Sequence, residues 1–208
     1  ESGILPATQE YLQAARRLCD EHGALLILDE VQTGMGHTGK LFAYEHYGIT
    51  PDILSSAKAL GGGFPIGAIL TTDKIAPTFG PGTHGSTFGG NPMACAVGSR
   101  AFDIINAPET LAHVEKQGKK FQTTLRELGE KTGAFKEVRG MGLLIGCVLA
   151  DKYQGRASEI TAAALKHGLM VLVAGADVVR LAPSLLLNDE DMAEGLKRLE
   201  AALKEWVD

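Results

Sequence analysis

Hydrophobic positions in the first part of the chain follow two different patterns, a helical period and a continuous run. Residues 8–22 carry apolar side chains three or four positions apart, which predicts an amphipathic helix. The face predicted to be buried consists of Leu12, Ala15, Leu18 and Cys19. Residues 23–30 form a short, continuous apolar run, which is typical of a strand buried on both faces of a parallel sheet. A helix candidate at 41–48 and strands at 52–57 and 65–72 follow, and this alternation predicts an α/β fold.

The pattern changes beyond a glycine-rich loop at 80–92. A helix from about 91 to 105 leads to Pro108, and a longer helix with one apolar stripe follows. That stripe consists of Leu111, Val114, Gly118, Phe121, Leu125 and Leu128. The strands expected around a helix near 157–167 lie near 134–139, 142–149, 169–173 and 178–182.

The last helix is expected to begin after Asn188, whose side chain can cap its first turn. Three acids at its positive end favour the same start, namely Asp189, Glu190 and Asp191. Its predicted buried face consists of Met192, Leu196, Leu199, Leu203 and Trp206. Because the pattern changes near residue 100, the sequence predicts one domain at 1–100 and a second domain at 101–208.

Composition and charge narrow the functional classes. Of the 208 residues, 45% are hydrophobic and 22% are charged, an ordinary balance for a soluble protein with a sizeable core. The formal net charge of -5 argues against a nucleic-acid-binding surface, which would need a basic patch. No apolar run approaches the ~20 residues of a membrane-spanning helix, so we expect no membrane association.

The cysteines indicate a cellular compartment, and the first residue indicates that the chain is part of a longer protein. Cys19, Cys95 and Cys147 stand far apart, without the spacing of metal ligands. We expect them to pack as small apolar side chains in a reducing cytoplasm. The chain begins at Glu1 rather than at a methionine, and we interpret it as a piece of a longer protein.

The stretch "LLILDEVQTGMGHTGKL" at 25–41 has two features of a nucleoside triphosphate site. Its apolar strand ends in acids, and its glycines have the G-x-x-x-x-G-K spacing of a phosphate-binding loop. Such a loop needs Ser or Thr directly after its lysine, but Leu41 follows Lys40. The acidic strand also comes directly before the glycines, whereas triphosphate folds place that acid on a later strand. The sequence therefore argues against a triphosphate site.

Lys58 is a candidate nucleophile within "SSAKALGGGFPIGA". It ends an apolar strand, has small neighbours and precedes three glycines. A lysine in a poorly solvated position loses proton affinity and can form a Schiff base. The small neighbours leave room for a flat ring, and the glycines allow close backbone approach. The alternative is a lysine that extends its charge from a strand end into water, and this is the commoner role.

Asp29 strengthens the catalytic interpretation of Lys58. Each of the two residues ends an apolar strand, so in a parallel sheet both side chains reach the same carboxyl edge. Pyridoxal phosphate chemistry requires a Schiff-base lysine and a carboxylate that keeps the pyridine nitrogen protonated, because the charged ring withdraws electrons from the substrate carbon. The alternative for Asp29 is the capping of a turn, a frequent role of aspartate in loops.

Three stretches carry a resemblance to a known family. Residues 25–68, "LLILDEVQTGMGHTGKLFAYEHYGITPDILSSAKALGGGFPIGA", resemble the cofactor core of the class III, ornithine-type aminotransferases. "GTHGSTFGGNPMACAV" and "VVRLAPSL" resemble later motifs of the same family, and within it the chain is most similar to acetylornithine and succinylornithine aminotransferases. The resemblance implies fold type I of the pyridoxal-phosphate-dependent transferases. Residues 1–100 would then be the C-terminal part of the large sheet domain, and residues 101–208 the small α+β domain.

The resemblance also implies roles for residues near the ring of the cofactor. Lys58 would attach pyridoxal phosphate covalently and then move the proton between substrate and cofactor. Asp29 would pair with the pyridine nitrogen, Val31 would pack on one ring face, and Gln32 would approach the ring hydroxyl. The glycines of the loop at 34–39 would only shape it.

Further roles lie outside this core. Thr87, with Ser86 beside it, would bind the cofactor phosphate of a partner subunit, which implies a homodimer with shared active sites. Arg180 would bind a substrate carboxylate, a task suited to its planar fork. Without the resemblance, Arg180 would be interpreted as a surface arginine of a strand.

The chain departs from the family in two ways. His37 stands where the family usually has arginine in G-R-T-G, which could alter a loop contact or subunit packing but removes no group needed for the bond chemistry. The family's N-terminal half, which supplies a glycine-rich phosphate cup, an aromatic residue on the ring and a glutamate near the carboxylate-binding arginine, has no counterpart in the sequence.

The expected reaction is transamination between N-acetylornithine or N-succinylornithine and 2-oxoglutarate, as part of a longer enzyme of arginine metabolism. Two alternatives stay open. The amine donor could be ornithine or 4-aminobutyrate, because the motifs serve the cofactor and one carboxylate. The chain could also be a non-catalytic piece, because it holds only part of the binding site.

Overall fold

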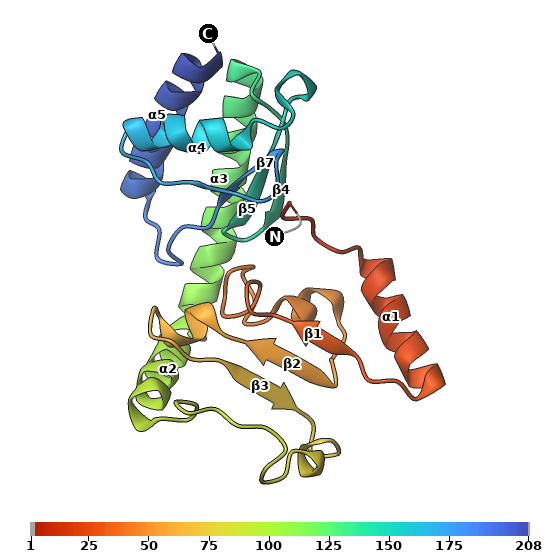
Figure 1. The fold of residues 1–208 in the computed structure, drawn as a ribbon. Coiled ribbons are helices and arrows are strands. Elements are labelled where there is room, and N and C mark those ends of the chain that lie inside the picture. Colours follow the sequence, from red (N-terminus) through yellow and green to blue (C-terminus); the bar gives the residue numbers. More distant parts are fainter. Residues whose placement is uncertain (1–2, 208) are drawn as a thin grey trace. The chain divides into compact units, whose positions relative to one another are not determined.

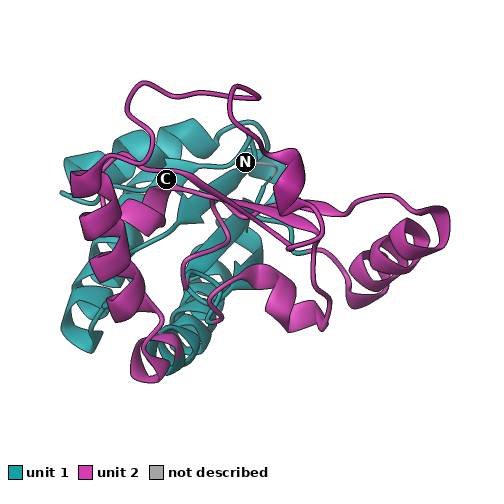
Figure 2. Cartoon of the chain, turned by 90° about the horizontal axis from the view of Figure 1, so that it is seen from below, with its two compact units in different colours: residues 1–6, 37–39, 112–208 teal, residues 7–36, 40–111 magenta. Residues whose placement is uncertain are grey.

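The computed structural model describes residues 3–207, which form two compact units (Figures 1 and 2). Unit 1, teal in Figure 2, comprises residues 1–6, 37–39 and 112–208. Unit 2, magenta, comprises residues 7–36 and 40–111. The units divide between Leu111 and Ala112, within a long helix. This division describes compactness within the chain, so the expected domain boundary near residue 100 stays a prediction.

Unit 2 is built on a three-stranded sheet of order β1-β2-β3 (Figure 1). The strands are β1 (Ile27–Asp29), β2 (Ile53–Ser56) and β3 (Ala68–Thr71). β1 runs parallel to β2, and β3 is antiparallel to β2. The helices of the unit are α1 (Gln9–His22), the 3-10 helices η1 (Ala43–Tyr47), η2 (Lys58–Gly61) and η3 (Ala76–Thr78), and α2 (Pro92–Ile105). The predicted α/β alternation is confirmed for this unit.

The helix α1 begins and ends at residues with capping chemistry. The hydroxyl of Thr8 accepts a hydrogen bond from the N–H of Tyr11, and Gly23 ends the helix with a φ of 64°. The side chains that pack against Leu26, Tyr47 and Ile49 are those of Leu12, Ala15 and Cys19. Leu18 was predicted on this face, but it is 48% exposed, because it lies roughly 120° around the helix from Leu12.

One prediction about the sheet region is confirmed only in part, and another is wrong. The candidate helix at 41–48 is a short 3-10 helix, which Gly48 ends with a φ of 63°. The first strand is not buried on both faces: Leu28 faces the core under α1, whereas Ile27 is 61% exposed and Asp29 is exposed. Alternate side chains of a strand point to opposite faces, so one face of β1 is open among the described residues.

Unit 1 contains an antiparallel sheet of order β4-β5-β7-β6. The strands are β4 (Phe135–Met141), β5 (Leu144–Leu149), β6 (Leu172–Val173) and β7 (Val178–Leu181). The helices are α3 (Pro108–Thr132), the 3-10 helix η4 (Asp151–Tyr153), α4 (Ala157–Lys166) and α5 (Asp189–Val207). All four expected strands are present, although β6 is much shorter than 169–173.

The core of unit 1 confirms the two predicted helix stripes. The fully buried side chains Val114 and Leu125 lie on α3, and those of Leu199 and Leu203 lie on α5. Asn188 Oδ1 accepts a hydrogen bond from the next turn of α5 at 2.8 Å, which confirms the predicted cap. These residues pack on β5, whose six residues are all buried.

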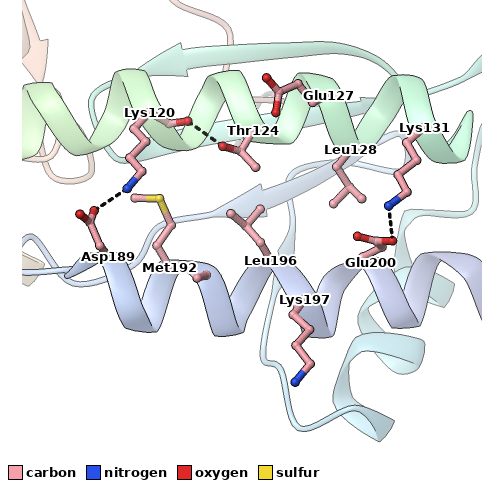
Figure 3. Close-up of a pocket in the computed structure, with 11 residues that line it drawn as sticks. Lys120, Thr124, Glu127, Leu128, Lys131, Asp189, Met192, Leu196, Lys197 and Glu200 are labelled. Carbon is pink, nitrogen blue, oxygen red and sulfur yellow. Dashed lines mark hydrogen bonds and ion pairs between the residues drawn. The ribbon is translucent and has the colours of Figure 1, made fainter.

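A groove of about 460 Å³ separates the exposed edges of α3 and α5 (Figure 3). Ion pairs cross it from Lys120 to Asp189 at 2.8 Å and from Lys131 to Glu200 at 2.7 Å. Hydrogen bonds from Lys131 and Lys204 lower the pKa of Glu200 to about 2. Paired charges of the chain itself therefore lie at both ends of the groove.

Three backbone segments of unit 1 meet without room for side chains. A Cβ on Gly118 of α3 would lie 2.3 Å from the carbonyl oxygen of Gly142, in the β4–β5 turn. A Cβ on Gly142 would in turn lie 2.5 Å from the oxygen of His37. That oxygen accepts a hydrogen bond from Leu143 N at 2.9 Å, so residues 37–39 pack as part of unit 1.

The cysteines differ in burial. Cys147 is fully buried, and burial raises the pKa of its thiol to about 12. Cys19 is half-buried, but Cys95 is exposed, so the prediction that all three pack as small apolar side chains is wrong for Cys95. Within residues 3–207, no helix is long and apolar enough to cross a bilayer, and no three acid, histidine or cysteine side chains cluster as metal ligands.

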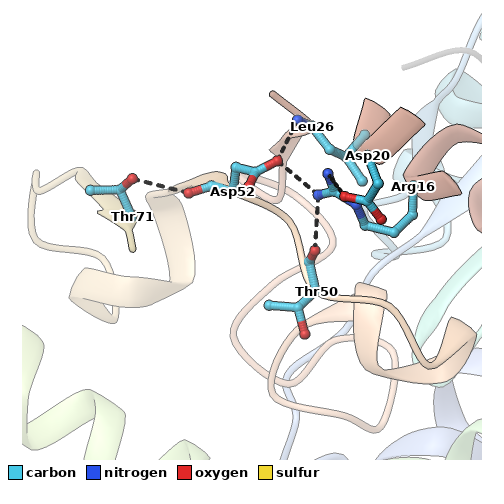
Figure 4. A network of polar contacts seen from close by, with 6 residues as sticks. All are labelled: Arg16, Asp20, Leu26, Thr50, Asp52 and Thr71. Atoms are coloured by element: carbon cyan, nitrogen blue, oxygen red, sulfur yellow. Dashed lines mark hydrogen bonds and ion pairs between the residues drawn. The ribbon is translucent and has the colours of Figure 1, made fainter. Parts of the chain in front are cut away.

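A polar network joins α1 to the starts of β1 and β2 (Figure 4). Arg16 Nη1 lies 2.7 Å from Asp52 Oδ2, and Arg16 Nη2 lies 2.7 Å from Asp20 Oδ1. Asp52 Oδ2 also accepts a hydrogen bond from Leu26 N at 2.7 Å. The carbonyl oxygen of Asp52 accepts a hydrogen bond from Thr71 Oγ1 at 3.0 Å, which adds the end of β3. Asp52 thus connects four elements: its carboxylate binds α1 and the start of β1, and its carbonyl oxygen binds β3.

We expect Asp52→Asn to lower the free energy of unfolding at neutral pH by about 1–3 kcal/mol, because hydrogen bonds to a charged group are lost. The bonds from Leu26 N and Arg16 lower the pKa of Asp52 below its usual 3.8. The stabilisation is therefore fully present well above pH 3.8 and is lost as the pH falls through the lower folded pKa. Urea unfolding between pH 3 and 7 measures this.

The matched control for Asp52 is Asp73→Asn, because Asp73 is exposed in the same unit. Its change should stay within about 0.5 kcal/mol at every pH. Equal unfolding free energies for the two variants at pH 7 would show that the network adds no stability.

Candidate functional site

Asp29 and Lys58 lie at the carboxyl ends of neighbouring parallel strands. Asp29 is the last residue of β1 and is in register with Ser55 of β2. Lys58 follows β2 as the first residue of η2. Gln32, just beyond β1, completes the group: Lys58 Nζ donates a hydrogen bond to its Oε1 at 2.6 Å. The sequence-based expectation that Asp29 and Lys58 reach one edge agrees with this arrangement.

The carboxylate of Asp29 is held by one of its two oxygens. Oδ1 accepts hydrogen bonds from Val31 N at 3.0 Å and from Ser55 Oγ at 3.1 Å. Oδ2 has no partner among the described residues. The side chain is thus oriented by the chain while one oxygen remains available on the open face of β1.

The backbone of Lys58 is strained. Its φ of 49° is in the left-handed region, which costs a non-glycine residue on the order of 1–3 kcal/mol and is most often found at functional positions. The side chain is exposed, so the prediction of a poorly solvated lysine is wrong for this chain. The physical reason is that the face of the sheet carrying Ile27 and Asp29 is open among the described residues.

The turn after Lys58 rests on α2. A Cβ on Gly98 of α2 would lie 3.5 Å from Leu60 O, so the helix and the turn approach closely. A Cβ on Gly61 would lie 2.7 Å from Ile66 Cγ2, whereas Gly62 ends η2 with a φ of 55°. The glycines that were predicted to admit a ligand therefore also serve the packing and the turn itself.

The glycine loop after β1 closes on itself. Gly34 N donates to Glu30 O at 2.9 Å, and Gly36 N donates to Leu41 O at 3.1 Å. Lys40, the lysine of the apparent phosphate-loop motif, is exposed. These two N–H groups are already hydrogen-bonded and cannot point at a phosphate, as the N–H groups of a phosphate-binding loop do.

The remaining predicted residues lie elsewhere. Ser86 and Thr87 are exposed in the loop between η3 and α2, where Ser86 Oγ accepts a hydrogen bond from Gly89 N at 2.9 Å. Arg180 lies on β7 in unit 1, whereas the other candidates lie in unit 2. Its Nε is buried with no hydrogen-bond partner among the described residues, beside an apolar cavity of about 210 Å³.

Sequence reasoning missed two polar residues at this edge. Ser55 could have been found by aligning the two parallel strands, which places it opposite Asp29. Glu30 had a weaker signal: an acid directly after an apolar strand, which proves to be 3% exposed. Ser55 holds the carboxylate of Asp29, and Glu30 holds the start of η1.

The group fits a protonated pyridine that carries an aldehyde. Lys58 provides a primary amine whose partner, Gln32, is uncharged. Asp29 Oδ2 provides a free acceptor for a ring N–H. An amine and an oriented carboxylate on one open strand edge are the donor set that pyridoxal phosphate requires.

Comparison with known proteins identifies first the class and then the family. The structure matches a crystal structure of N-acetylornithine aminotransferase from Stenotrophomonas maltophilia with a TM-score of 0.91 and 45% identity, over 99% of this chain and 54% of that chain. The fold is therefore that of the pyridoxal-phosphate-dependent aminotransferases, in the part that the chain covers. The family model of the class-III aminotransferases matches residues 1–203, and the chain belongs to that family.

Relatives with curated names agree with this assignment. An acetylornithine aminotransferase of Neisseria meningitidis serogroup B is 81% identical over all of this chain and 52% of its own length. A Pseudomonas aeruginosa protein named succinylornithine transaminase/acetylornithine aminotransferase is 56% identical over all of this chain and 51% of its own length. The chain spans about half the length of the curated relatives it matches.

We expect Gly34→Ala to lower the free energy of unfolding by about 1–3 kcal/mol through overpacking. Its Cβ would lie 2.7 Å from Glu30 O and 2.9 Å from Phe42 Cδ1. Gly85→Ala is the control, because a Cβ there meets nothing within 4 Å. Thermal unfolding of the two variants measures the difference, and a Gly34→Ala protein as stable as its control would argue against the closed turn.

Proposed function

We propose that this chain belongs to an enzyme that transfers an amino group between N-acetylornithine or N-succinylornithine and 2-oxoglutarate, in arginine metabolism, with pyridoxal phosphate bound to Lys58. The observation that carries the proposal is the shared edge of β1 and β2, where Lys58 Nζ meets Gln32 Oε1 at 2.6 Å and Asp29 retains a free oxygen. Relatives of 56–81% identity bear acetylornithine or succinylornithine names, which supports the substrate class.

Each residue at this edge receives a role. Lys58 binds the cofactor covalently and carries the proton to and from the reacting substrate carbon. Asp29 holds a proton on the ring nitrogen through Oδ2, while Ser55 and Val31 N fix its other oxygen. Gln32 orients the ring hydroxyl, and Val31 packs on a ring face. When bound, the cofactor supplies an electron sink for the carbanion of the substrate.

Carboxylate and phosphate recognition is assigned to the other predicted residues. Arg180 binds the carboxylate of both substrates, and its buried, unpartnered Nε supports this role, since a buried donor without a partner is costly. Ser86 and Thr87 bind the phosphate of a cofactor held by a second copy of the chain. The exposed hydroxyl loop is consistent with a ligand or partner that covers it.

A homodimer with shared sites accounts for exposed apolar side chains around this loop. Phe88 is 80% exposed, and Met93 and Val97 are 65% and 36% exposed, one turn apart on α2. We assign the contact to a second copy rather than to a membrane or a nucleic acid. A cytoplasmic location accords with the free cysteines Cys19, Cys95 and Cys147.

Two alternatives have observations in their favour. Ornithine aminotransferases share the fold: one from Plasmodium falciparum matches with a TM-score of 0.90 and 33% identity, over 99% of this chain and 52% of that chain, so an unacylated amine donor is a rival. The second rival is a non-catalytic piece, because the chain spans only about half the length of its relatives.

The full-length protein should form one covalent adduct after incubation with pyridoxal phosphate and borohydride reduction, and peptide mass should place it on Lys58. Lys58→Ala should lose the adduct and lose about 10²–10⁴-fold in turnover, because proton transfer is lost. Asp29→Asn should keep the adduct but lose about 10²–10³-fold through weaker charge stabilisation.

Lys40→Ala is the matched control for Lys58, since both lysines are exposed in unit 2. It should keep the adduct and the turnover. An adduct on any other lysine would overturn the proposed site. The same reduction on the 208-residue chain alone tests the second alternative. An adduct on Lys58 of that chain would argue against a non-catalytic piece.

A panel of amine donors tests the substrate. We expect kcat/KM for N-acetylornithine and N-succinylornithine to exceed that for ornithine and 4-aminobutyrate at least about tenfold, a difference of about 1.4 kcal/mol. Arg180→Lys should raise KM for 2-oxoglutarate about tenfold or more, because the planar fork is lost. Arg198→Lys is its control on α5. A preference for an unacylated donor would refute the acylornithine assignment.

A further inference from the structure

Glu30, the neighbour of Asp29, is a buried carboxylate with three donors around it. Oε1 accepts a hydrogen bond from Tyr44 N at 2.8 Å. Oε2 accepts hydrogen bonds from Ala43 N at 2.9 Å and from Thr33 Oγ1 at 2.6 Å. The side chain is only 3% exposed. Buried carboxylates are rare unless they are hydrogen-bonded, and the three donors meet this requirement on both oxygens of Glu30.

The backbone of Glu30 is engaged as well. Its N–H donates to Ser55 O at 3.0 Å, which continues the β1–β2 pairing one residue beyond Asp29. Its carbonyl accepts a hydrogen bond from Gly34 N at 2.9 Å. Gln32 lies in the middle of this closed turn. The direction of the Gln32 side chain, and so its 2.6 Å contact with Lys58 Nζ, depends on the path of residues 30–34.

The Glu30 side chain connects the two halves of the glycine loop near the end of β1. Thr33 belongs to the outgoing half, whereas Ala43 and Tyr44 begin η1 after the returning half. The carboxylate therefore fixes both ends of a long loop against the end of β1. Without it, the N–H groups of Ala43 and Tyr44 at the start of η1 would lose their side-chain acceptor.

We propose that Glu30 is a positioning residue of the cofactor site: its buried carboxylate fixes the loop so that Asp29 and Gln32 face Lys58. The inference rests on the proposed function and adds a residue to it. Glu30 does not touch the reacting atoms. It acts through the turn at 30–34, which carries Gln32 on one side and continues from Asp29 on the other.

Asp52 provides a matched comparison in the same sheet. Its carboxylate also accepts a backbone N–H, that of Leu26, but it does so at the opposite ends of β1 and β2, away from Lys58. A purely structural carboxylate at either end would alter stability alone. A positioning carboxylate at the site end would alter cofactor binding in protein that is still folded.

The test uses the full-length protein as wild type, Glu30→Gln, Glu30→Asp and Asp52→Asn, each kept well below its unfolding temperature. The extent of borohydride-trapped adduct on Lys58 is measured by peptide mass against pyridoxal phosphate concentration. The pH midpoint of the absorption band of the bound cofactor is measured in parallel. An amide at position 30 presents N–H groups to the N–H of Ala43 or Tyr44, so Glu30→Gln should break the loop contact.

We expect Glu30→Gln to need on the order of tenfold or more cofactor for half-labelling, and its absorption midpoint to move, because a small misplacement of site groups is costly. Asp52→Asn should stay within about twofold of wild type while losing stability. Glu30→Asp keeps the charge on a shorter arm and should lie between wild type and Glu30→Gln, which keeps the test decisive if Glu30→Gln does not fold.

Three results would overturn parts of this account. Glu30 variants that label Lys58 at the wild-type concentration, with an unmoved midpoint, would reduce Glu30 to a structural residue. An Asp52→Asn protein that weakens labelling as much as Glu30→Gln would do the same. A wild-type protein without any adduct on Lys58 would instead refute the proposed function, and with it this role for Glu30.

Discussion

The parallel register of β1 with β2 is the constraint on which the candidate site depends. It sets Asp29 opposite Ser55 and continues through the bond from Glu30 N to Ser55 O. A shift of one residue would turn Asp29 to the other face of the sheet, because side chains alternate along a strand. The chemistry of the edge is therefore a property of the strand pairing.

Polar groups tie neighbouring elements together at both ends of the two strands. At their starts, Asp52 binds Leu26 N and Arg16 of α1, so the helix, β1 and β2 are tied by one charged group. At their ends, Glu30 ties the returning loop to β1. Apolar contacts beneath the sheet, such as Leu28 with the α1 core and Leu54 with Met35, add area but little direction. The directional hydrogen bonds of the polar groups therefore decide how these elements are aligned.

Much of this architecture follows from the sequence pattern. Periodic apolar positions were enough to predict the buried faces of α3 and α5. An aspartate and a lysine at the ends of two apolar strands were enough to predict that both lie at one edge of the sheet. The pattern failed where local geometry decides: η1 is a 3-10 helix, and Leu18 turns away from the packed face. It also failed for Ile27 and Lys58, which are exposed, because an apolar run does not reveal which residues cover it. Glu30 was missed because its two backbone partners lie 13 and 14 residues away.

Adjacent acids at the end of β1 have opposite surroundings for one physical reason. A strand alternates its side chains, so Asp29 points to the open face while Glu30 points into the packed side beneath the loop. The open carboxylate keeps a free oxygen, and the buried one has donors on both oxygens. The strand thus divides a pair of adjacent acids into one group that can meet a ligand and one that holds the backbone. The same alternation places Ser55 beside Asp29 and Leu54 in the core, so the division extends to the neighbouring strand.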